Sequence, residues 1–138
     1  MEINKKKIIM SEDEIARIVV NSGLKVHRAL GPGLLESSYE ACLIYELKKQ
    51  GLKVESQKAL PVIYNDVTLD VGYRIDIMVE DKFIIELKAV RELTDLHTAQ
   101  LLTYLKLSQC KLGLLINFNV ELFKYGIERV INGYLKVN

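Results

Sequence analysis

The chain has 138 residues, of which 49% are hydrophobic, and its formal net charge is +1. A chain of this length and apolar content forms one domain with a sizeable core, which excludes a disordered protein. The near-neutral charge removes the simplest argument for nucleic-acid binding, a strongly basic domain, although it leaves room for a local basic patch.

No part of the sequence predicts export or membrane insertion. The N-terminal segment 1–7 is polar, and no apolar run approaches the roughly 20 residues of a membrane span. The two cysteines, Cys42 and Cys110, lack metal-type spacing, and we interpret them as reduced thiols. We therefore expect a cytoplasmic protein with a single domain over residues 1–138, in which residues 1–10 form a poorly ordered N-terminal segment.

Two helices are predicted in the first fifty residues. Ser11 and Glu14 match a capping box, and apolar residues follow at helical spacing as far as Leu30. Gly31-Pro32 ends this helix, because glycine suits the C′ position and proline cannot continue a helix. The second helix is predicted over about 34–50. Its apolar arc comprises Leu35, Tyr39, Cys42, Leu43 and Leu47.

A β region follows the helices. Residues 54–64 are broken by Pro61, which predicts an edge position or an irregularity, and Asn65-Asp66 is turn chemistry. Residues 69–79 alternate and predict one strand, and residues 83–90 predict the next.

The last third of the chain predicts a helix and one more buried strand. The helix covers 95–108, with Thr94 or Asp95 as its N-cap, and the strand covers 112–118. Residues 125–131 fit either a short strand or a helix. The order α-α-β-β-β-α-β predicts an α/β (α+β) fold, and the helix over 95–108 is a crossover that makes its two flanking strands parallel.

Glu86 and Lys88 interrupt an apolar run with the sequence FIIELK, residues 83–88. On a strand, residues i and i+2 share a face, so these two side chains project together. The same tripeptide, ELK, occurs at Glu46–Lys48 in the second predicted helix, where positions i and i+2 point about 200° apart. Only the strand copy therefore aims both charges at one point, and the helical copy is interpreted as a solvated edge.

Asp76 interrupts the preceding strand in the same way. It reaches the face of Glu86 only if the connection between the two strands has an odd length, such as a three-residue loop or a bulge. A two-residue turn at Asp81-Lys82 would instead pair Asp76 with Leu87 and place the two acids on opposite faces of the sheet.

Two carboxylates on one strand face raise one pKa or require a cation. Hard oxygen ligands suit Mg²⁺ or Mn²⁺, and two protein carboxylates leave coordination positions for water and phosphate oxygens. Lys88 would orient the attacking water or offset the charge that builds on the phosphate. The alternative is a cross-strand ion pair on an exposed face.

The helix over 95–108 places His97, Gln100 and Tyr104 on one side, at positions i, i+3 and i+7. This side is either the polar outer face of an amphipathic helix or a face toward the strand carboxylates, where Gln100 and Tyr104 would contact a phosphate or position a water.

Glu36 lies at the border of the apolar arc of the second helix. It is a third acid at the edge of the metal site, a first-turn acid favoured by the helix dipole, or a capping-box partner of Gly33. His27 on the first helix is interpreted as an interfacial histidine with satisfied hydrogen bonds.

The segment from His27 to Glu40 contains Gly33-x-x-Glu36-x-x-Tyr39 and resembles the signature of the GxxExxY protein family, which is placed in the PD-(D/E)XK nuclease superfamily. The resemblance extends from about residue 15 to residue 132. It implies a restriction-endonuclease-like core, a mixed β-sheet flanked by helices, and Mg²⁺-dependent hydrolysis of phosphodiester bonds.

The resemblance also implies roles for single residues. Asp76 resembles the first metal-binding acid of the superfamily, Glu86 the second and Lys88 its lysine. Gln100 with Tyr104 resembles the Q-x-x-x-Y element of the RecB-like exonuclease branch, and Glu36 resembles a helix acid that precedes the sheet. Ile75 stands where the superfamily often has a proline before the first acid.

These observations predict a nuclease that uses Mg²⁺ or Mn²⁺ and acts on nucleic acid, DNA rather than RNA. The alternatives are a catalytically inactive nucleic-acid-binding or accessory protein on the same fold, and an interaction protein without nucleic acid. The chain is small enough for a homodimer to build a larger groove. The predicted catalytic residues are Asp76, Glu86, Lys88, Glu36 and Gln100; the predicted substrate contacts are Tyr104, Tyr39 and His97; the predicted metal ligands are Asp76 and Glu86.

Overall fold

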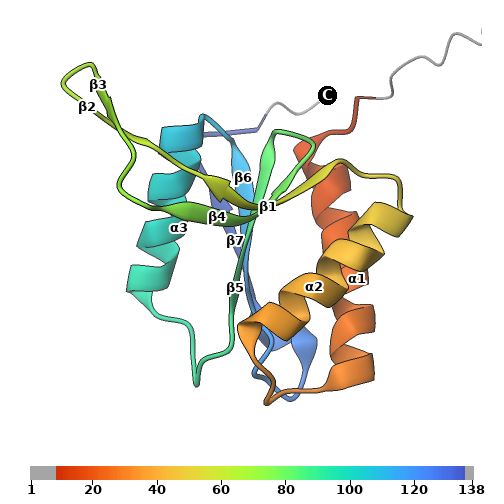
Figure 1. Ribbon diagram of the computed structural model, residues 1–138. Helices are drawn as coiled ribbons and strands as arrows, with labels where there is room; N and C mark the ends of the chain where they lie inside the picture. Colours follow the sequence, from red (N-terminus) through yellow and green to blue (C-terminus); the bar gives the residue numbers. More distant parts are fainter. Residues whose placement is uncertain (1–8, 136–138) are drawn as a thin grey trace, which may run out of the picture.

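The computed structural model describes residues 9–135, and most of the predicted segment 1–10 lies outside this range. Within it, the chain forms three helices, a 3₁₀ turn and seven strands (Figure 1). The helices are α1 (Glu12–Leu30), α2 (Glu36–Lys49) and α3 (Asp95–Ser108), and the 3₁₀ turn is η1 (Phe123–Gly126). The strands are β1 (Val54–Ala59), β2 (Val62–Tyr64), β3 (Val67–Leu69), β4 (Arg74–Val79), β5 (Phe83–Lys88), β6 (Leu112–Asn117) and β7 (Ile127–Ile131).

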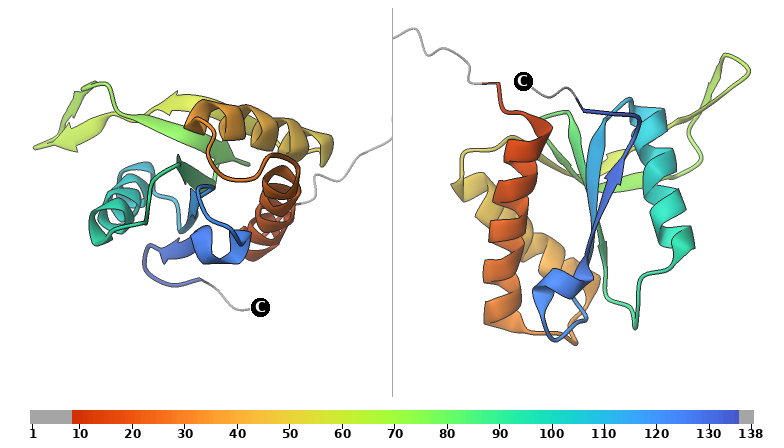
Figure 2. Two further views of the ribbon diagram at one scale, coloured as in Figure 1. Left: turned by 90° about the horizontal axis from the view of Figure 1, so that it is seen from below. Right: turned by 180° about the vertical axis from the view of Figure 1, so that it is seen from behind.

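Five strands form one mixed sheet in the order β1-β4-β5-β6-β7. Neighbouring strands are antiparallel except β5 and β6, which are parallel and joined by α3, as the crossover predicted. Helices α1 and α2 cover one face of the sheet and α3 covers the other (Figure 2). The predicted α/β fold, a restriction-endonuclease-like mixed sheet between helices, is confirmed.

The sheet is buried between two apolar layers. The larger layer joins α1 and α2 to the side chains of Ile77, Ile85 and Leu87. The smaller layer joins α3 to Met78 and Ile84 on the opposite face. The alternation along β5 therefore places Glu86 and Lys88 on the α3 side, where their neighbour Ile84 already lies.

The prediction of one strand over 69–79 is wrong. Asp70 accepts a hydrogen bond from the Gly72 N–H at 3.1 Å, and Gly72 has a φ of 88°, so the chain turns between β3 and β4. Strands β2 and β3 form a separate two-stranded sheet beyond the main one. Residues 125–131 contain the end of η1 followed by strand β7, so the ambiguous segment is largely a strand.

The predicted helix ends need one correction. Ser11 Oγ accepts a hydrogen bond from the Glu14 N–H at 3.1 Å, and Gly31, with a φ of 69°, ends α1 as predicted. Helix α2 begins two residues later than predicted, and Leu35 is its N-cap rather than part of its apolar arc. Leu35 is consequently 74% exposed, because it precedes the first turn that faces the core.

No helix within residues 9–135 is both long enough and apolar enough to cross a membrane.

Candidate functional site

The connection between β4 and β5 decides which residues meet. It consists of three residues, and two of them, Glu80 and Asp81, have left-handed backbone with φ values of 52° and 57°. Lys53 fixes this turn, since its N–H donates to Glu80 Oε2 at 2.7 Å and its Nζ donates to Asp81 Oδ2 at 2.8 Å. The loop therefore has the odd length that a same-face arrangement of the two acids requires.

The ladder between β4 and β5 runs from Val79↔Phe83 to Ile77↔Ile85. Continued by one residue, this register sets Asp76 opposite Glu86. At that point the main-chain N–H groups donate to side-chain carboxylates instead of to carbonyls of the neighbouring strand. The Asp76 N–H donates to Glu86 Oε2 at 2.9 Å, and the Leu87 N–H donates to Asp76 Oδ2 at 2.9 Å. The structure thus brings the two acids together, each anchored to the main chain of the opposite strand.

Glu86 is an unusual carboxylate for the centre of a sheet. Its side chain is only 5% exposed. Burial, followed by the negative charge of Asp76, raises the pKa of Glu86 to about 8, and the positive charge of Lys88 acts in the opposite direction. Two adjacent acids in a poorly hydrated position form a site with a deficit of positive charge.

Lys88 follows Glu86 by two residues and shares its face of β5. The ion pairs formed within residues 9–135 do not include Lys88, so its ammonium group is not committed to a surface salt bridge. It is half-buried at the end of the strand, so its ammonium group is available to an anionic ligand that binds beside the carboxylates.

Gln57 was not predicted from the sequence. It lies in the middle of β1 with a φ of 51°, and the ladder between β1 and β4 has no pair between Gln57 and Asp76. Its side-chain amide donates to Glu40 Oε1 at 2.9 Å and to Asp76 Oδ1 at 3.3 Å. Such backbone strain persists only where surrounding contacts maintain it. Both oxygens of Asp76 therefore have donors, which orient this carboxylate.

Helix α2 brings two more acids to this end of the sheet. Glu36 is the first residue of α2, so the capping-box alternative is wrong, and its Oε1 accepts a hydrogen bond from the Ala89 N–H at 3.2 Å. Glu40, one turn later, was missed, although its i+4 spacing from Glu36 indicates a shared face. Both acids line a cavity of about 640 Å³ together with Gln57 and Asp76.

Tyr39 has a structural position instead of the predicted contact with substrate. It is 0% exposed, and its ring stacks on Phe118 with 4.4 Å between the ring centroids. Its hydroxyl donates to Gly31 O at 2.6 Å and accepts from the Leu34 N–H at 3.1 Å. A substrate cannot reach this side chain. Instead, Tyr39 fastens the loop that carries Gly33, whose φ is 99°, and thereby fixes where Glu36 enters α2.

Helix α3 presents Tyr104 to the acids. Tyr104 is buried, and burial followed by the negative charge of Glu86 raises its pKa. The Gln100 amide donates to the Tyr104 hydroxyl at 3.2 Å, and the Tyr73 ring lies 6.0 Å from the Tyr104 ring. Among the described hydrogen bonds, Gln100 therefore reaches Tyr104 and not the acids, and it is itself exposed.

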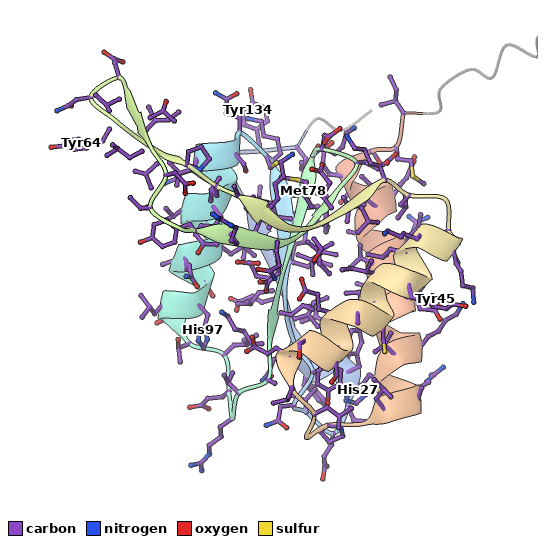
Figure 3. All side chains as sticks on the ribbon, in the orientation of Figure 1. His27, Tyr45, Tyr64, Met78, His97 and Tyr134 are labelled. Atoms are coloured by element: carbon purple, nitrogen blue, oxygen red, sulfur yellow. The ribbon has the colours of Figure 1, made fainter. Side chains whose placement is uncertain are left out.

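The two histidines serve local structure. His97 Nδ1 accepts from the Thr94 N–H at 3.1 Å, which completes a capping box at the N-terminus of α3. His27 is buried, and its Nε2 lies 2.6 Å from Val120 O, as expected of a satisfied interfacial histidine. Figure 3 shows them on different helices, with His97 at the start of α3 and His27 near the end of α1.

A restriction-endonuclease-like sheet with paired acids and a lysine at one end defines the class of protein. Residues 13–130 match the family model described as the PD-(D/E)XK nuclease superfamily. The chain belongs to this superfamily, which supports a nuclease-type function with nucleic acid as the class of substrate. Comparison with curated proteins gives no match, and comparison with solved structures gives none either.

Proposed function

We propose that the protein is a nuclease that depends on a divalent metal ion and hydrolyses phosphodiester bonds in DNA. The observation that carries the proposal is the approach of Asp76 to Glu86 at the end of β5, with Lys88 two residues beyond. Hydrogen bonds from the Leu87 N–H and the Gln57 amide to Asp76, and from the Asp76 N–H to Glu86, hold the two carboxylates without neutralising the pair.

The donor set fits Mg²⁺ or Mn²⁺. Carboxylate oxygens are the ligands that both ions prefer, and a divalent cation relieves the repulsion that raises the pKa of Glu86. Within residues 9–135 no cluster of three or more His, Cys, Asp or Glu side chains has metal-binding geometry. Asp76 and Glu86 would therefore hold the ion as a pair, and water and phosphate oxygens would complete its coordination.

The chain's own residues divide the remaining tasks. A bound Mg²⁺ supplies Lewis-acid polarisation of the phosphate and a lower pKa for water. Lys88 offsets the negative charge that grows on the phosphate as the bond to the attacking water forms. Glu36, held by the Ala89 N–H, borders the cavity beside Asp76 from α2, while Tyr104 lies on the α3 side, where the Gln100 amide donates to its hydroxyl.

The decisive experiment is cleavage of supercoiled plasmid DNA by purified protein in Mg²⁺ or Mn²⁺, with single-stranded RNA as a parallel substrate. We expect nicking by the wild type, loss of nicking on addition of EDTA, and no activity in Asp76→Ala or Glu86→Ala. Equal activity in the wild type and in both variants would identify a contaminant and refute the proposal.

One observation favours a second candidate, a non-cleaving nucleic-acid-binding or accessory protein on the same fold. Among the described residues, the cavity beside Asp76 is lined by Glu36 and Glu40 and by no lysine or arginine, which disfavours a scissile phosphate at the acids and leaves nucleic acid or a partner to bind another surface. Salt-dependent DNA binding that persists in Glu86→Ala, with no cleavage by the wild type, would support this candidate.

The expected cytoplasmic location is also retained as a proposal. It is supported by Cys42 and Cys110, which are both free thiols in the structure, as is usual in a reducing compartment.

A further inference from the structure

The hairpin of β2 and β3 projects from the body of the protein as an arm, which we define as residues 61–73. Figure 1 shows it extending beyond α3, and the left view of Figure 2 shows it reaching away from all three helices. Among the described elements, β2 and β3 are in extensive contact only with each other. Apart from Tyr73 at its base, whose ring lies 6.0 Å from that of Tyr104, the arm has no layer of the described protein to cover it.

The arm is nevertheless a regular and anchored structure. Asn65 and Asp66 have φ values of 48° and 63°, which suit the two-residue turn of a hairpin, and Tyr64 pairs with Val67 across it. At the base, the Leu60 N–H donates to Tyr73 O at 3.0 Å. These hydrogen bonds hold the arm as an ordered hairpin fixed to the body at its base.

One face of the arm is entirely apolar. Directly paired residues share a face, as do residues i and i+2 on a strand. The pairs Val62↔Leu69 and Tyr64↔Val67 consequently place four apolar side chains on one side. The other side carries Ile63 and Thr68. Tyr64 is 66% exposed and Val67 is 53% exposed, and Figure 3 shows Tyr64 pointing away from the body.

A two-stranded hairpin is marginally stable in water, and a contiguous apolar patch on a soluble protein marks an interaction surface. We infer that the arm is a dimerisation element, whose apolar face packs against the same face of the arm of a second copy of this chain. Such a contact is isologous, because the same residues contribute from both copies.

Charge favours a second copy over nucleic acid. The arm contains no lysine or arginine, and its charged residues are Asp66 at the tip and Asp70 near the base, which would repel phosphates. Arg74 follows immediately at the base and is 41% exposed in its side chain, with Asp70 at 3.6 Å. Two arms that pack antiparallel bring the acidic tip of each toward the arginine at the base of the other.

The area of the apolar face limits the strength of such a dimer. Its four side chains offer roughly 400 Å² per copy, and two copies together reach about 800 Å², the size of a weak, concentration-dependent contact. The arm continues directly into β4, which carries Asp76. A dimer formed in this way holds two carboxylate pairs in one particle.

The test compares two neighbouring substitutions on opposite faces of the hairpin. Val67→Lys places a charge on the apolar face, and Thr68→Lys places the same charge on the other face. The mass in solution is measured over a range of concentrations by sedimentation or by light scattering after gel filtration. Circular dichroism and thermal unfolding verify that both variants fold, and Leu69→Lys serves as a second variant on the apolar face.

We expect a dimer for the wild type and for Thr68→Lys. For Val67→Lys and Leu69→Lys we expect folded monomers, with dimer dissociation constants at least about 100-fold higher, because a lysine would be buried in the interface twice by symmetry. A wild type that stays monomeric at all concentrations would overturn the inference, as would an equal effect of the substitutions on both faces. These measurements require no cleavage, so their outcome is separate from that of the proposed function.

Discussion

The tripeptide ELK occurs twice in this molecule, and the two copies have different surroundings. On α2, Glu46 and Lys48 point in different directions, and the nearest cation to Glu46 Oε2 is Lys49, at 3.9 Å. On β5, Glu86 and Lys88 share a face, and Glu86 accepts the main-chain N–H of Asp76 at 2.9 Å. The prediction of a solvated edge is wrong for Glu46, whose side chain is only 18% exposed and whose Oε2 is buried without a hydrogen-bond partner among the described residues. The two copies differ instead in the second acid, Asp76, that lies beside Glu86.

The two glutamates are followed by the same two residues in sequence, and their surroundings in the fold differ. Glu86 is raised in pKa to about 8 because a sheet buries it beside a second acid, whereas Glu46 lies on a helix whose neighbouring turn supplies a lysine. A buried acid whose charge is not balanced by nearby cations has a shifted pKa, and such shifted pKa values are typical of functional sites. Glu46 has Lys49 at 3.9 Å, a weak ion pair, and within the described residues it is not hydrogen-bonded to a second acid.

The largest expected difference between the copies concerns their lysines. Lys88→Ala should lower the rate of DNA cleavage by about 10²–10³-fold, the loss typical of a group that stabilises transition-state charge. Lys48→Ala, which removes the matching lysine of the helical copy, should leave the rate unchanged. The measurement is plasmid nicking in Mg²⁺ by each variant after thermal unfolding has shown that both are folded. If both variants cleave at the wild-type rate, the strand copy has no catalytic role.

A smaller effect, on metal affinity, is expected from Gln57, whose amide donates to the second acid beside Glu86. Gln57→Gly keeps the backbone, because glycine adopts a φ of 51° readily, but removes the amide that orients Asp76. We expect Mn²⁺ affinity to fall by about 10- to 100-fold, as for other partners of metal ligands, in calorimetric titration.

Ser56→Ala is the matched control for Gln57→Gly. Ser56 donates to Glu40 at 3.2 Å and lies next to Gln57 on β1, so its removal disturbs the same acid without altering the donor to Asp76. Unchanged Mn²⁺ affinity in Gln57→Gly would show that Asp76 needs no such donor. If Asp76→Ala binds Mn²⁺ as tightly as the wild type, the proposed metal site at Asp76 is wrong.

The smallest effect is on stability, and it compares the two glutamates. The pKa of Glu86 is raised from 4.5 to about 8 in the folded state. Between these values the unfolded chain has lost the proton that the folded protein keeps, so the stability of the metal-free protein falls as the pH rises. Below 4.5 both states are protonated and above 8 both are ionised, so this contribution is then constant.

We expect the melting temperature of the metal-free wild type to fall by several degrees between pH 5 and pH 8, since each kcal/mol moves it by about 3–5 °C at this chain length. Glu86→Gln should remove most of that slope, and Glu46→Gln should retain it. Thermal unfolding followed by circular dichroism in EDTA provides the measurement. A slope that persists in Glu86→Gln would assign the pH dependence to another group.

Local rules predicted much of the fold. The Ser11 cap, the Gly31 end of α1, the helix over 95–108 and the alternation in β5 depend on neighbours a few residues away, so the sequence displays them directly. The resemblance of the His27–Glu40 segment likewise gave the superfamily that residues 13–130 match. A prediction that depended on a longer segment was wrong: the strand predicted over 69–79 is two strands with a turn between them.

By itself, the sequence determined that Glu86 and Lys88 share one face of a strand and that Glu46 and Lys48 do not, because the periods of strands and helices are local properties. Only the tertiary structure decided that Asp76 stands opposite Glu86, through a three-residue turn held by Lys53, which immediately precedes β1. It also decided that Gln57 reaches Asp76 and that Tyr39 is buried. These relations depend on strand register and on contacts between residues far apart in the chain, which no local pattern specifies.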